Sequence, residues 1–232
     1  MLRVEGVSVA YGSVLALQEV DLTVARPGAL HGIIGPNGAG KSTLLDAITG
    51  RIKVSRGRVS VNGQDITHLS VVARRRLGMS RSFQRTSILP GISVGEQLEL
   101  VASQLGETGL DEIVDALELG AAYGRAADSI AYGDQRRVDI ALALIGAPRL
   151  MLLDEPAAGL STTETVSLFE HLARLVRARG VYAVVVEHDV DAVFRFCDEI
   201  TALDLGCVLA RGSPEEVRRD PRVIAAYLGT AA

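Results

Sequence analysis

The fold is decided by the stretch ALHGIIGPNGAGKST, residues 29–43. The apolar run from Ala29 to Ile34 is typical of a short buried strand, and a glycine-rich turn follows it and ends at Lys41. Apolar residues at helical spacing come next. A strand, a glycine-rich loop and a helix in this order form the phosphate-binding loop pattern, so the stretch predicts an α/β nucleotide-binding fold.

Each fixed position of this loop has a chemical task. Glycines let the backbone wrap a polyphosphate closely, and the N–H groups of the loop and of the helix N-terminus present positive potential to it. We expect Lys41 to reach the β- and γ-phosphates of ATP and the Ser42 hydroxyl to bind Mg²⁺. The alternative, a glycine-rich turn that binds nothing, accounts less well for all the fixed positions. The predicted ATP-binding residues here are Gly35, Asn37, Gly38, Ala39, Gly40, Lys41, Ser42 and Thr43.

A second motif, LMLLDE at residues 150–155, is an apolar strand that ends in two carboxylates. We expect Asp154 to hold Mg²⁺ through water and Glu155 to polarise the attacking water as general base, a role typically worth about 10² to 10⁴-fold in rate. A solvated strand end is the usual alternative for such a pair. The phosphate-binding loop upstream favours the catalytic interpretation.

Turn signals and periodicity predict alternating strands and helices in the rest of the chain. Residues from about Arg85 to Pro148 are dominated by helical patterns, so we expect a helical insert there, at Val94–Leu105, Leu110–Leu119 and Gln135–Ile145. A helix is also expected from Thr162 to Arg179, with Gly180 as its stop signal. The expected strands are Leu2–Ala10 and Val20–Val24, as hairpin strands, and Ala29–Ile34, Leu150–Leu153 and Val181–Val186, as buried parallel strands.

Composition excludes several classes of protein. The chain of 232 residues carries 28 acidic against 24 basic residues, for a net charge of -4, so we expect no nucleic-acid partner. A membrane span needs roughly 18 consecutive apolar residues, whereas the longest strong run is the six residues Val181–Val186. The stretch that begins at Met1 has neither a long apolar run nor a small-residue cleavage site, so we expect no export. Cys197 and Cys207 form neither a disulfide framework nor a zinc spacing.

The stretch IAYGDQRR at residues 130–137, followed by a helical run, resembles the signature motif of ATP-binding cassette (ABC) ATPases. Four further family elements occur in the expected order. By this resemblance Tyr11 stacks on adenine, Gln84 touches Mg²⁺ and water, His188 is the switch histidine that contacts the γ-phosphate, and the loop after the acids contacts a dimer partner. That dimer-contact loop is Ala158, Gly159, Leu160 and Ser161, and the signature loop acting in trans is Ala131, Tyr132, Gly133 and Asp134.

Each of these residues also has a structural alternative. Tyr11 could instead cover the core at a strand end, Gln84 could be an ordinary loop residue, and His188 could simply begin a helix. The triplet Arg74 to Arg76 is expected to form a solvated helix face, and His31, His68 and His171 are expected to be structural because they show no ligand spacing.

The chain departs from the family pattern at three positions. Ala131 replaces the usual serine, which removes a hydroxyl that would reach the γ-phosphate across the dimer and so costs about one hydrogen bond. Ser161 replaces the usual Asp or Asn, and with Glu164 it also reads as a capping box, so a helix cap and a contact in trans both stay open. Leu142 stands where Arg is common.

The resemblance implies a P-loop NTPase core sheet with an N-terminal antiparallel β-subdomain, residues 1–84 and 149–232, and a helical subdomain, residues 85–148. It implies ATP and Mg²⁺ as ligands and a second ABC ATPase subunit as partner. Transmembrane permease subunits, docked near Gln84 to Glu99, and an extracytoplasmic solute-binding protein complete the expected assembly, at the cytoplasmic face of a bacterial inner membrane.

Several stretches resemble the ATPases of branched-chain amino-acid importers in particular, among them Pro156-Ala-Ala-Gly-Leu, Glu187-His-Asp and the ending from Gly212. The sequence thus predicts the ATP-hydrolysing subunit of an importer for branched-chain or other hydrophobic amino acids. A related system for urea, amides or lipids, and a soluble ABC protein outside transport, are the alternatives.

Overall fold

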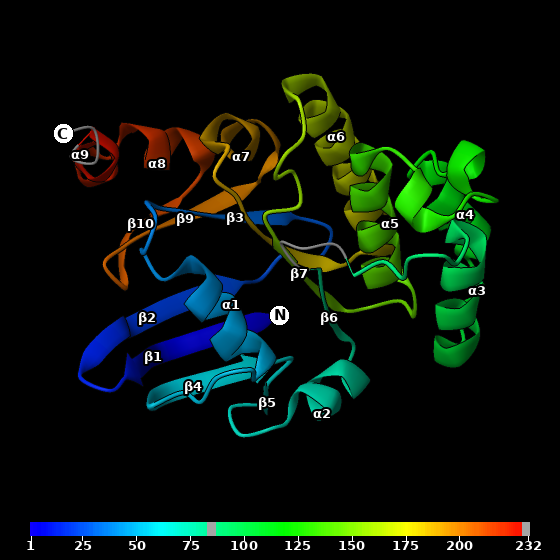
Figure 1. Ribbon diagram of the computed structural model, residues 1–232. Coiled ribbons are helices and arrows are strands. Elements are labelled where there is room, and N and C mark those ends of the chain that lie inside the picture. The colour runs from blue at the N-terminus through cyan, green and yellow to red at the C-terminus, as the bar shows by residue number, and fades with distance from the viewer. Residues whose placement is uncertain (83–86, 229–232) are drawn as a thin grey trace.

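The computed structural model describes residues 1–82 and 87–228, and within them the strands form two sheets (Figure 1). The larger sheet has the strand order β10-β9-β3-β8-β7-β6, and the smaller has the order β2-β1-β4-β5. The first helix, α1 (Lys41–Thr49), lies between the two sheets. Its apolar side chains pack in one core cluster with residues of both, including Leu2, Leu22 and Leu152.

The larger sheet is mostly parallel. Its central strands β3 (Leu30–Ile34), β7 (Leu150–Asp154) and β8 (Tyr182–Val186) pair in parallel, so their carboxyl ends lie at one edge. Apart from half-buried Tyr182, every residue of these three strands is buried, as their continuous apolar runs predict. The outer strands are β6 (Met79–Arg81), β9 (Glu199–Asp204) and β10 (Cys207–Gly212).

The smaller sheet is antiparallel, and its inner face closes over α1. Its strands are β1 (Leu2–Tyr11), β2 (Val14–Val24), β4 (Arg56–Val61) and β5 (Gln64–Asp65). The expected hairpin of the first two strands is confirmed, although β2 begins six residues before Val20, because its register with β1 continues across bulges to the turn at Tyr11 and Val14. The sequence patterns did not predict β4 and β5.

The region between β6 and β7 is mainly helical and forms a lobe beside the larger sheet (Figure 1). Helix α3 (Val94–Leu105) has the expected bounds, α4 (Leu110–Ala116) ends three residues early, and α5 (Tyr132–Leu144) begins three residues early. Two short 3₁₀ turns, Gly120–Ala122 and Ala127–Ser129, join the last two helices.

The remaining helices cover the larger sheet. The expected helix α6 (Thr162–Arg179) is confirmed at both ends, because Ser161 and Glu164 form a capping box and Gly180 closes the helix at φ 61°. Helices α7 (Val190–Phe196), α8 (Pro214–Arg219) and α9 (Pro221–Leu228) follow. In the part of the chain that the structure describes, no helix is both long and apolar enough to cross a bilayer.

One expectation is wrong: Arg74, in helix α2 (Val71–Arg76), is buried rather than solvated. Its guanidinium donates to the carbonyl oxygens of Ala47 and Ile48, at 2.8 and 2.6 Å, at the C-terminal end of α1. It also donates to Thr67 O and Leu69 O. The last turn of a helix offers unpaired carbonyls and negative potential, which explains why a charged side chain lies there.

Candidate functional site

The loop between β3 and α1 has a backbone that only glycine suits at two points. Gly35 has φ 155°, and a Cβ there would lie 2.2 Å from Leu203 O. Gly40, at the N-cap of α1, has φ 101°, and a Cβ there would lie 2.9 Å from Ala16 O. No side chain caps this helix N-terminus. The loop therefore presents backbone N–H groups and the positive end of α1 at its mouth.

Lys41 is 6% exposed and lies along this loop. Its Nζ donates to Gly35 O at 2.6 Å and to Pro36 O at 3.0 Å. Burial lowers the pKa of Lys41, while the nearby carboxylates of Glu155 and Asp154 act in the opposite direction. The ammonium group is thus held beside the two acids that the sequence analysis singled out.

The loop opens into a cavity of about 280 Å³. The residues from Asn37 to Thr43 form most of its wall, together with Ala16, Glu155 and His188. The structure therefore brings together three predicted site elements that are far apart in the sequence: the phosphate-binding loop, the expected general base and the expected switch histidine.

Glu155 and His188 face one another across the ends of neighbouring strands. His188 Nε2 lies 2.7 Å from Glu155 Oε1, and the histidine side chain is 47% exposed while the glutamate side chain is 10% exposed. The backbone N–H of Glu155 donates to Val186 O at 2.8 Å, which ties the end of β7 to the end of β8. Glu155 adopts a left-handed backbone with φ 50°. A histidine at this distance can hold the carboxylate oriented.

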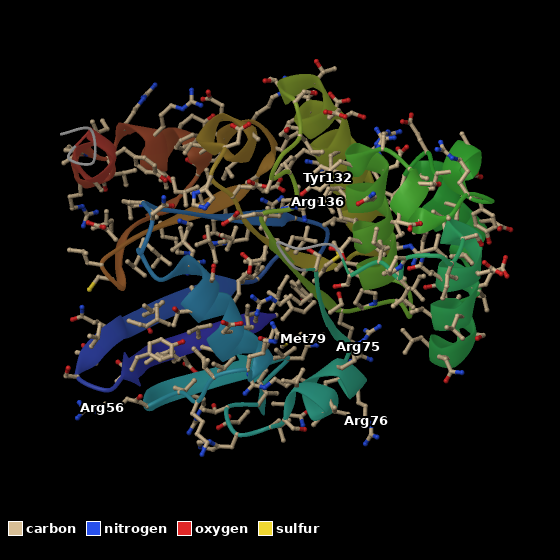
Figure 2. The ribbon with its side chains drawn as sticks, in the orientation of Figure 1. Arg56, Arg75, Arg76, Met79, Tyr132 and Arg136 are labelled. Atoms are coloured by element: carbon tan, nitrogen blue, oxygen red, sulfur yellow. The ribbon has the colours of Figure 1, made fainter. Side chains whose placement is uncertain are left out.

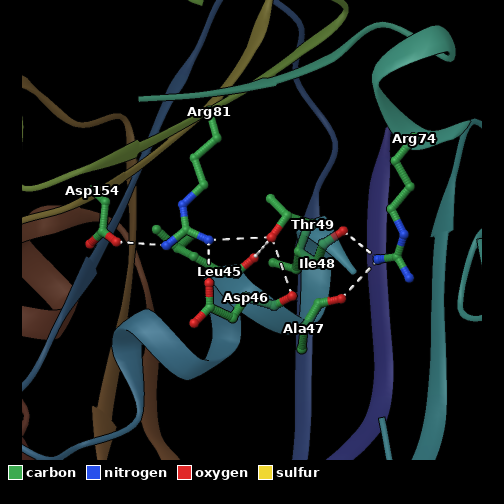
Figure 3. A network of polar contacts seen from close by, with 8 residues as sticks. All are labelled: Leu45, Asp46, Ala47, Ile48, Thr49, Arg74, Arg81 and Asp154. Atoms are coloured by element: carbon green, nitrogen blue, oxygen red, sulfur yellow. Dashed lines mark hydrogen bonds and ion pairs between the residues drawn. The ribbon is translucent and has the colours of Figure 1, made fainter. Parts of the chain in front are cut away.

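Asp154, at the last position of β7, is buried, and its two carboxylate oxygens differ in their hydrogen bonds. Oδ2 accepts from Arg81 Nη2 at 2.8 Å, and Arg81 Nη1 also contacts Asp46 Oδ1 in α1 (Figure 3). Oδ1 has no hydrogen-bond partner among residues 1–82 and 87–228. A buried carboxylate oxygen with spare acceptor capacity fits a hydrated Mg²⁺, which prefers oxygen ligands and retains several waters.

Gly35 directly follows β3 and Asp154 ends β7, and neither is among the described residues that line this cavity. Two further predicted residues are not placed in it either. Tyr11 lies at the end of β1 and is 52% exposed, and the described residues that line the cavity do not include it. Gln84 lies outside the described residues. For both of them the assigned role stays a prediction.

The predicted signature residues begin helix α5, away from the cavity of the same chain. Ala131 is the N-cap of α5, and its side chain makes no capping hydrogen bond. Tyr132, Gly133 and Asp134 form the first turn, and Tyr132 is 45% exposed. Figure 2 shows Tyr132 and Arg136 near the top of α5, close to the start of α6.

The predicted dimer-contact loop runs from Ala158 to Ser161 and leads into α6. Ser161 Oγ accepts from the backbone N–H of Glu164 at 3.4 Å, and Glu164 Oε2 accepts from Ser161 N at 2.9 Å. The capping alternative for Ser161 is thus confirmed, and contact in trans stays a prediction. Leu160 is half-buried and packs against the main core cluster.

Sequence reasoning missed two residues beside the site, Arg81 and Glu187. Arg81 ends β6, and its partners lie 35 and 73 residues away in the chain, so no local pattern marks it. Glu187 stands between β8 and His188 and is 3% exposed. The available signal was a carboxylate placed directly after a continuous apolar strand, the same signal that marked Asp154.

Comparison with known proteins gives two family matches. Residues 17–158 match the family model described as ABC transporter, and residues 207–232 match the one described as Branched-chain amino acid ATP-binding cassette transporter. The first match covers more than half of the chain.

Individual relatives match over almost the whole length. The chain is 34% identical to the high-affinity branched-chain amino acid transport ATP-binding protein LivG of Escherichia coli, covering 100% of this chain and 98% of LivG. It is 33% identical to the corresponding protein BraF of Pseudomonas aeruginosa, with the same coverage. Among solved structures, an ATP-binding cassette of an ABC transporter in its ADP conformation matches with a TM-score of 0.89 at 30% identity, covering 99% of this chain and 98% of that one.

Proposed function

This chain belongs to the ABC transporter ATP-binding family, and we propose that it hydrolyses ATP to power the import of branched-chain or other hydrophobic amino acids. The observation that carries the hydrolytic part is the cavity in which the phosphate-binding loop, Glu155 and His188 meet. We infer the solute class from the relatives, since LivG and BraF are named as branched-chain amino acid transport ATP-binding proteins.

The roles proposed for Asn37 to Thr43, Glu155 and His188 follow from their places in the cavity, and those proposed for Gly35, Tyr11 and Gln84 follow from the family resemblance. The loop residues Gly35 and Asn37 to Thr43 bind the phosphates of ATP, with Lys41 on the β- and γ-phosphates. Glu155 accepts a proton from the attacking water, and His188 holds the Glu155 carboxylate and the γ-phosphate in place. Tyr11 stacks on adenine, and Gln84 orients the attacking water.

Mg²⁺ fits the oxygen groups of Ser42, which lines the cavity, and of Asp154, which ends β7. The residues that would hold it are Ser42, whose side chain is exposed at the start of α1, Asp154 through water, and Gln84. When bound, the ion neutralises charge on the β- and γ-phosphate oxygens. Arg81 fixes one of the two carboxylate oxygens of Asp154 through a charge-assisted hydrogen bond.

A complete site needs a second cassette. The residues Ala131 to Asp134 do not line the cavity of their own chain, although the resemblance assigns them to phosphate binding. We therefore propose that they act in trans, on ATP bound to a partner subunit, and that the loop Ala158 to Ser161 contacts that subunit. Similar cassettes at 27% identity and a TM-score of 0.79 include one described as dimeric.

A second cavity, of about 270 Å³, is the proposed docking site for the permease. It lies between α2, β6 and α5, in a mainly apolar wall that carries several arginines, and Leu142 forms part of that wall. Of the stretch Gln84 to Glu99, Ser87 lines it. We propose that this cavity lies where the core, residues 1–84 and 149–232, meets the helical subdomain, residues 85–148. Permease subunits there would hold the chain at the cytoplasmic face of a bacterial inner membrane and couple it to an extracytoplasmic binding protein.

The test is ATP turnover by the purified chain and by Glu155→Gln. We expect the variant to lose at least about 10²-fold in turnover and to bind ATP with unchanged affinity. Glu215→Gln, which changes an exposed acid far from the cavity, is the matched control. Undiminished hydrolysis by Glu155→Gln would reject Glu155 as the base.

The transport assignment needs a second measurement. We expect co-expressed permeases for hydrophobic amino acids to co-purify with the chain and to stimulate its turnover when reconstituted with their loaded binding protein. Stimulation by a urea, amide or lipid transporter instead would replace the solute class, and native isolation with ribosomes and no membrane protein would reject transport.

A further inference from the structure

Two buried charged side chains, Glu187 and Arg136, hydrogen-bond the backbone after β7. Glu187 Oε1 accepts from the backbone N–H of Ala157 at 2.7 Å. Arg136 Nη2 donates to the backbone carbonyl of Ala158 at 3.3 Å. The two contacts fall on Ala157, directly before the dimer-contact loop, and on Ala158, its first residue, so together they fix where the loop leaves the core.

Glu187 also joins this loop to the switch histidine. It is 3% exposed, it directly follows β8, and its second oxygen, Oε2, accepts from the backbone N–H of His188 at 3.1 Å. The Glu187 carboxylate therefore accepts from one backbone N–H after β7 and from a second backbone N–H after β8. His188 in turn lies 2.7 Å from Glu155, so the three residues form a continuous path from the cavity to the loop.

Arg136 extends the path to the predicted signature helix. It is 2% exposed, lies in α5, and its guanidinium carbon is 5.2 Å from the centre of the Tyr132 ring. Tyr132 packs on the same loop, because a Cβ at Gly159 would lie 2.9 Å from its Cε1 atom. Figure 2 shows the two side chains together on α5.

Burying a carboxylate costs free energy unless hydrogen bonds or a cation compensate its charge. Burial raises the pKa of Glu187 to about 7, although both backbone N–H donors lower it. An apolar residue at position 187 would avoid that cost but would leave two N–H groups without their acceptor. The carboxylate is the group that can accept from both at once, through its two oxygens.

We propose that Glu187 is a positioning residue that, through Ala157, sets the dimer-contact loop relative to His188. It thereby couples the switch histidine of one subunit to the surface that this subunit offers to the other. Arg136 fixes the same loop from the signature helix. The inference rests on the proposed ATP-driven dimer, and it adds a residue that neither touches nucleotide nor crosses the interface.

The experiment measures ATP-dependent dimerisation by analytical ultracentrifugation in the hydrolysis-deficient Glu155→Gln background. Adding Glu187→Gln should weaken dimerisation at least about tenfold, because an amide has one acceptor oxygen where the two N–H groups use both carboxylate oxygens. ATP binding by the monomer should stay within about twofold. Glu170→Gln, which changes an exposed acid on α6, should leave dimerisation unchanged.

The outcomes separate the two hypotheses. If the Glu155→Gln parent does not dimerise with ATP, the proposed function itself fails. If the parent dimerises and Glu187→Gln dimerises equally well, the positioning role is overturned. This holds even if Glu187→Gln has a lower melting temperature, because Glu187 would then serve stability alone. Arg136→Gln provides the second route: it should weaken dimerisation even if Glu187→Gln fails to fold, and normal dimerisation by it would also count against the proposal.

Discussion

Arg81 binds Asp154 at the end of the strand that carries both acids, with Nη2 2.8 Å from Oδ2. The same guanidinium reaches back to Asp46 and to Thr49 in α1 (Figure 3). A single side chain thus joins the helix of the phosphate-binding loop to the predicted Mg²⁺ carboxylate. The side chains of Arg81 and Asp154 are 8% and 9% exposed, so this ion pair is largely shielded from water.

Replacing Arg81 by Gln should therefore lower the free energy of unfolding by about 3 kcal/mol, because the Asp154 carboxylate would stay buried without its cation. Denaturation with urea at pH 7 measures the change. Arg58→Gln is the control: the side chains of its ion pair with Asp65 are 64% and 50% exposed, so we expect this pair to contribute little to stability. Equal losses in both variants would contradict the expectation.

Arg74 should matter more for stability than its neighbour Arg76. Arg74→Met keeps most of the side-chain volume but leaves the carbonyls of Ala47 and Ile48 without their buried donor, so we expect a loss of about 2 to 4 kcal/mol. Arg76 is exposed, and Arg76→Met should change stability by less than about 0.5 kcal/mol. Thermal unfolding of both variants measures the two losses. If Arg74→Met proves as stable as the parent, the expectation is contradicted, and water must replace the guanidinium as the donor.

Ala131→Ser should stabilise the chain. Ala131 has the extended backbone of an N-cap, φ -59° and ψ 151°, but no side-chain acceptor, whereas a serine oxygen can accept from a backbone N–H in the first turn of α5. We expect a gain of about 1 kcal/mol in unfolding free energy, measured in urea without nucleotide.

The same Ala131→Ser variant tests the predicted role in trans. If position 131 also faces the γ-phosphate of a partner subunit, ATP-dependent dimerisation should tighten by roughly fivefold, about one hydrogen bond. A gain in stability with unchanged dimerisation would limit position 131 to capping α5.

Glu187 should make stability depend on pH. Its folded pKa of about 7 is raised above the unfolded value, mainly by burial, so the folded state holds the proton more tightly. The free energy of unfolding should therefore fall as pH rises from about 5 to about 8, by at most about 3 kcal/mol relative to Glu187→Gln. Urea denaturation of both proteins at pH 5, 6, 7 and 8 tests this, and parallel profiles would contradict it.

Local patterns were sufficient where the chemistry itself is local. The loop from Gly35 to Thr43 and the helix Thr162–Arg179 are predicted from contiguous residues, because a glycine-rich turn, a capping box and a terminal glycine are all short-range signals. The strand Arg56–Val61 escaped prediction because its first three residues are exposed and polar, so the alternation covers only its second half.

The fates of the charged residues could not be predicted locally. Arg74 reads as one of three consecutive arginines, and what distinguishes it is the end of a helix 26 and 27 residues away in the chain. Likewise, Glu187 gains its role from Ala157, 30 residues earlier, across the pairing of β7 with β8. These contacts depend on sheet order, which single-residue patterns do not encode.

The left-handed backbone of Glu155 sets stability against activity at one position. A non-glycine residue at φ 50° costs on the order of 1 kcal/mol or more, a cost that glycine would not bear. Backbone strain taken alone would thus favour glycine at position 155, which has no carboxylate. We therefore expect glutamate to persist there because of its proposed role in turnover, and we expect a relative that does not hydrolyse ATP to be free to lose it.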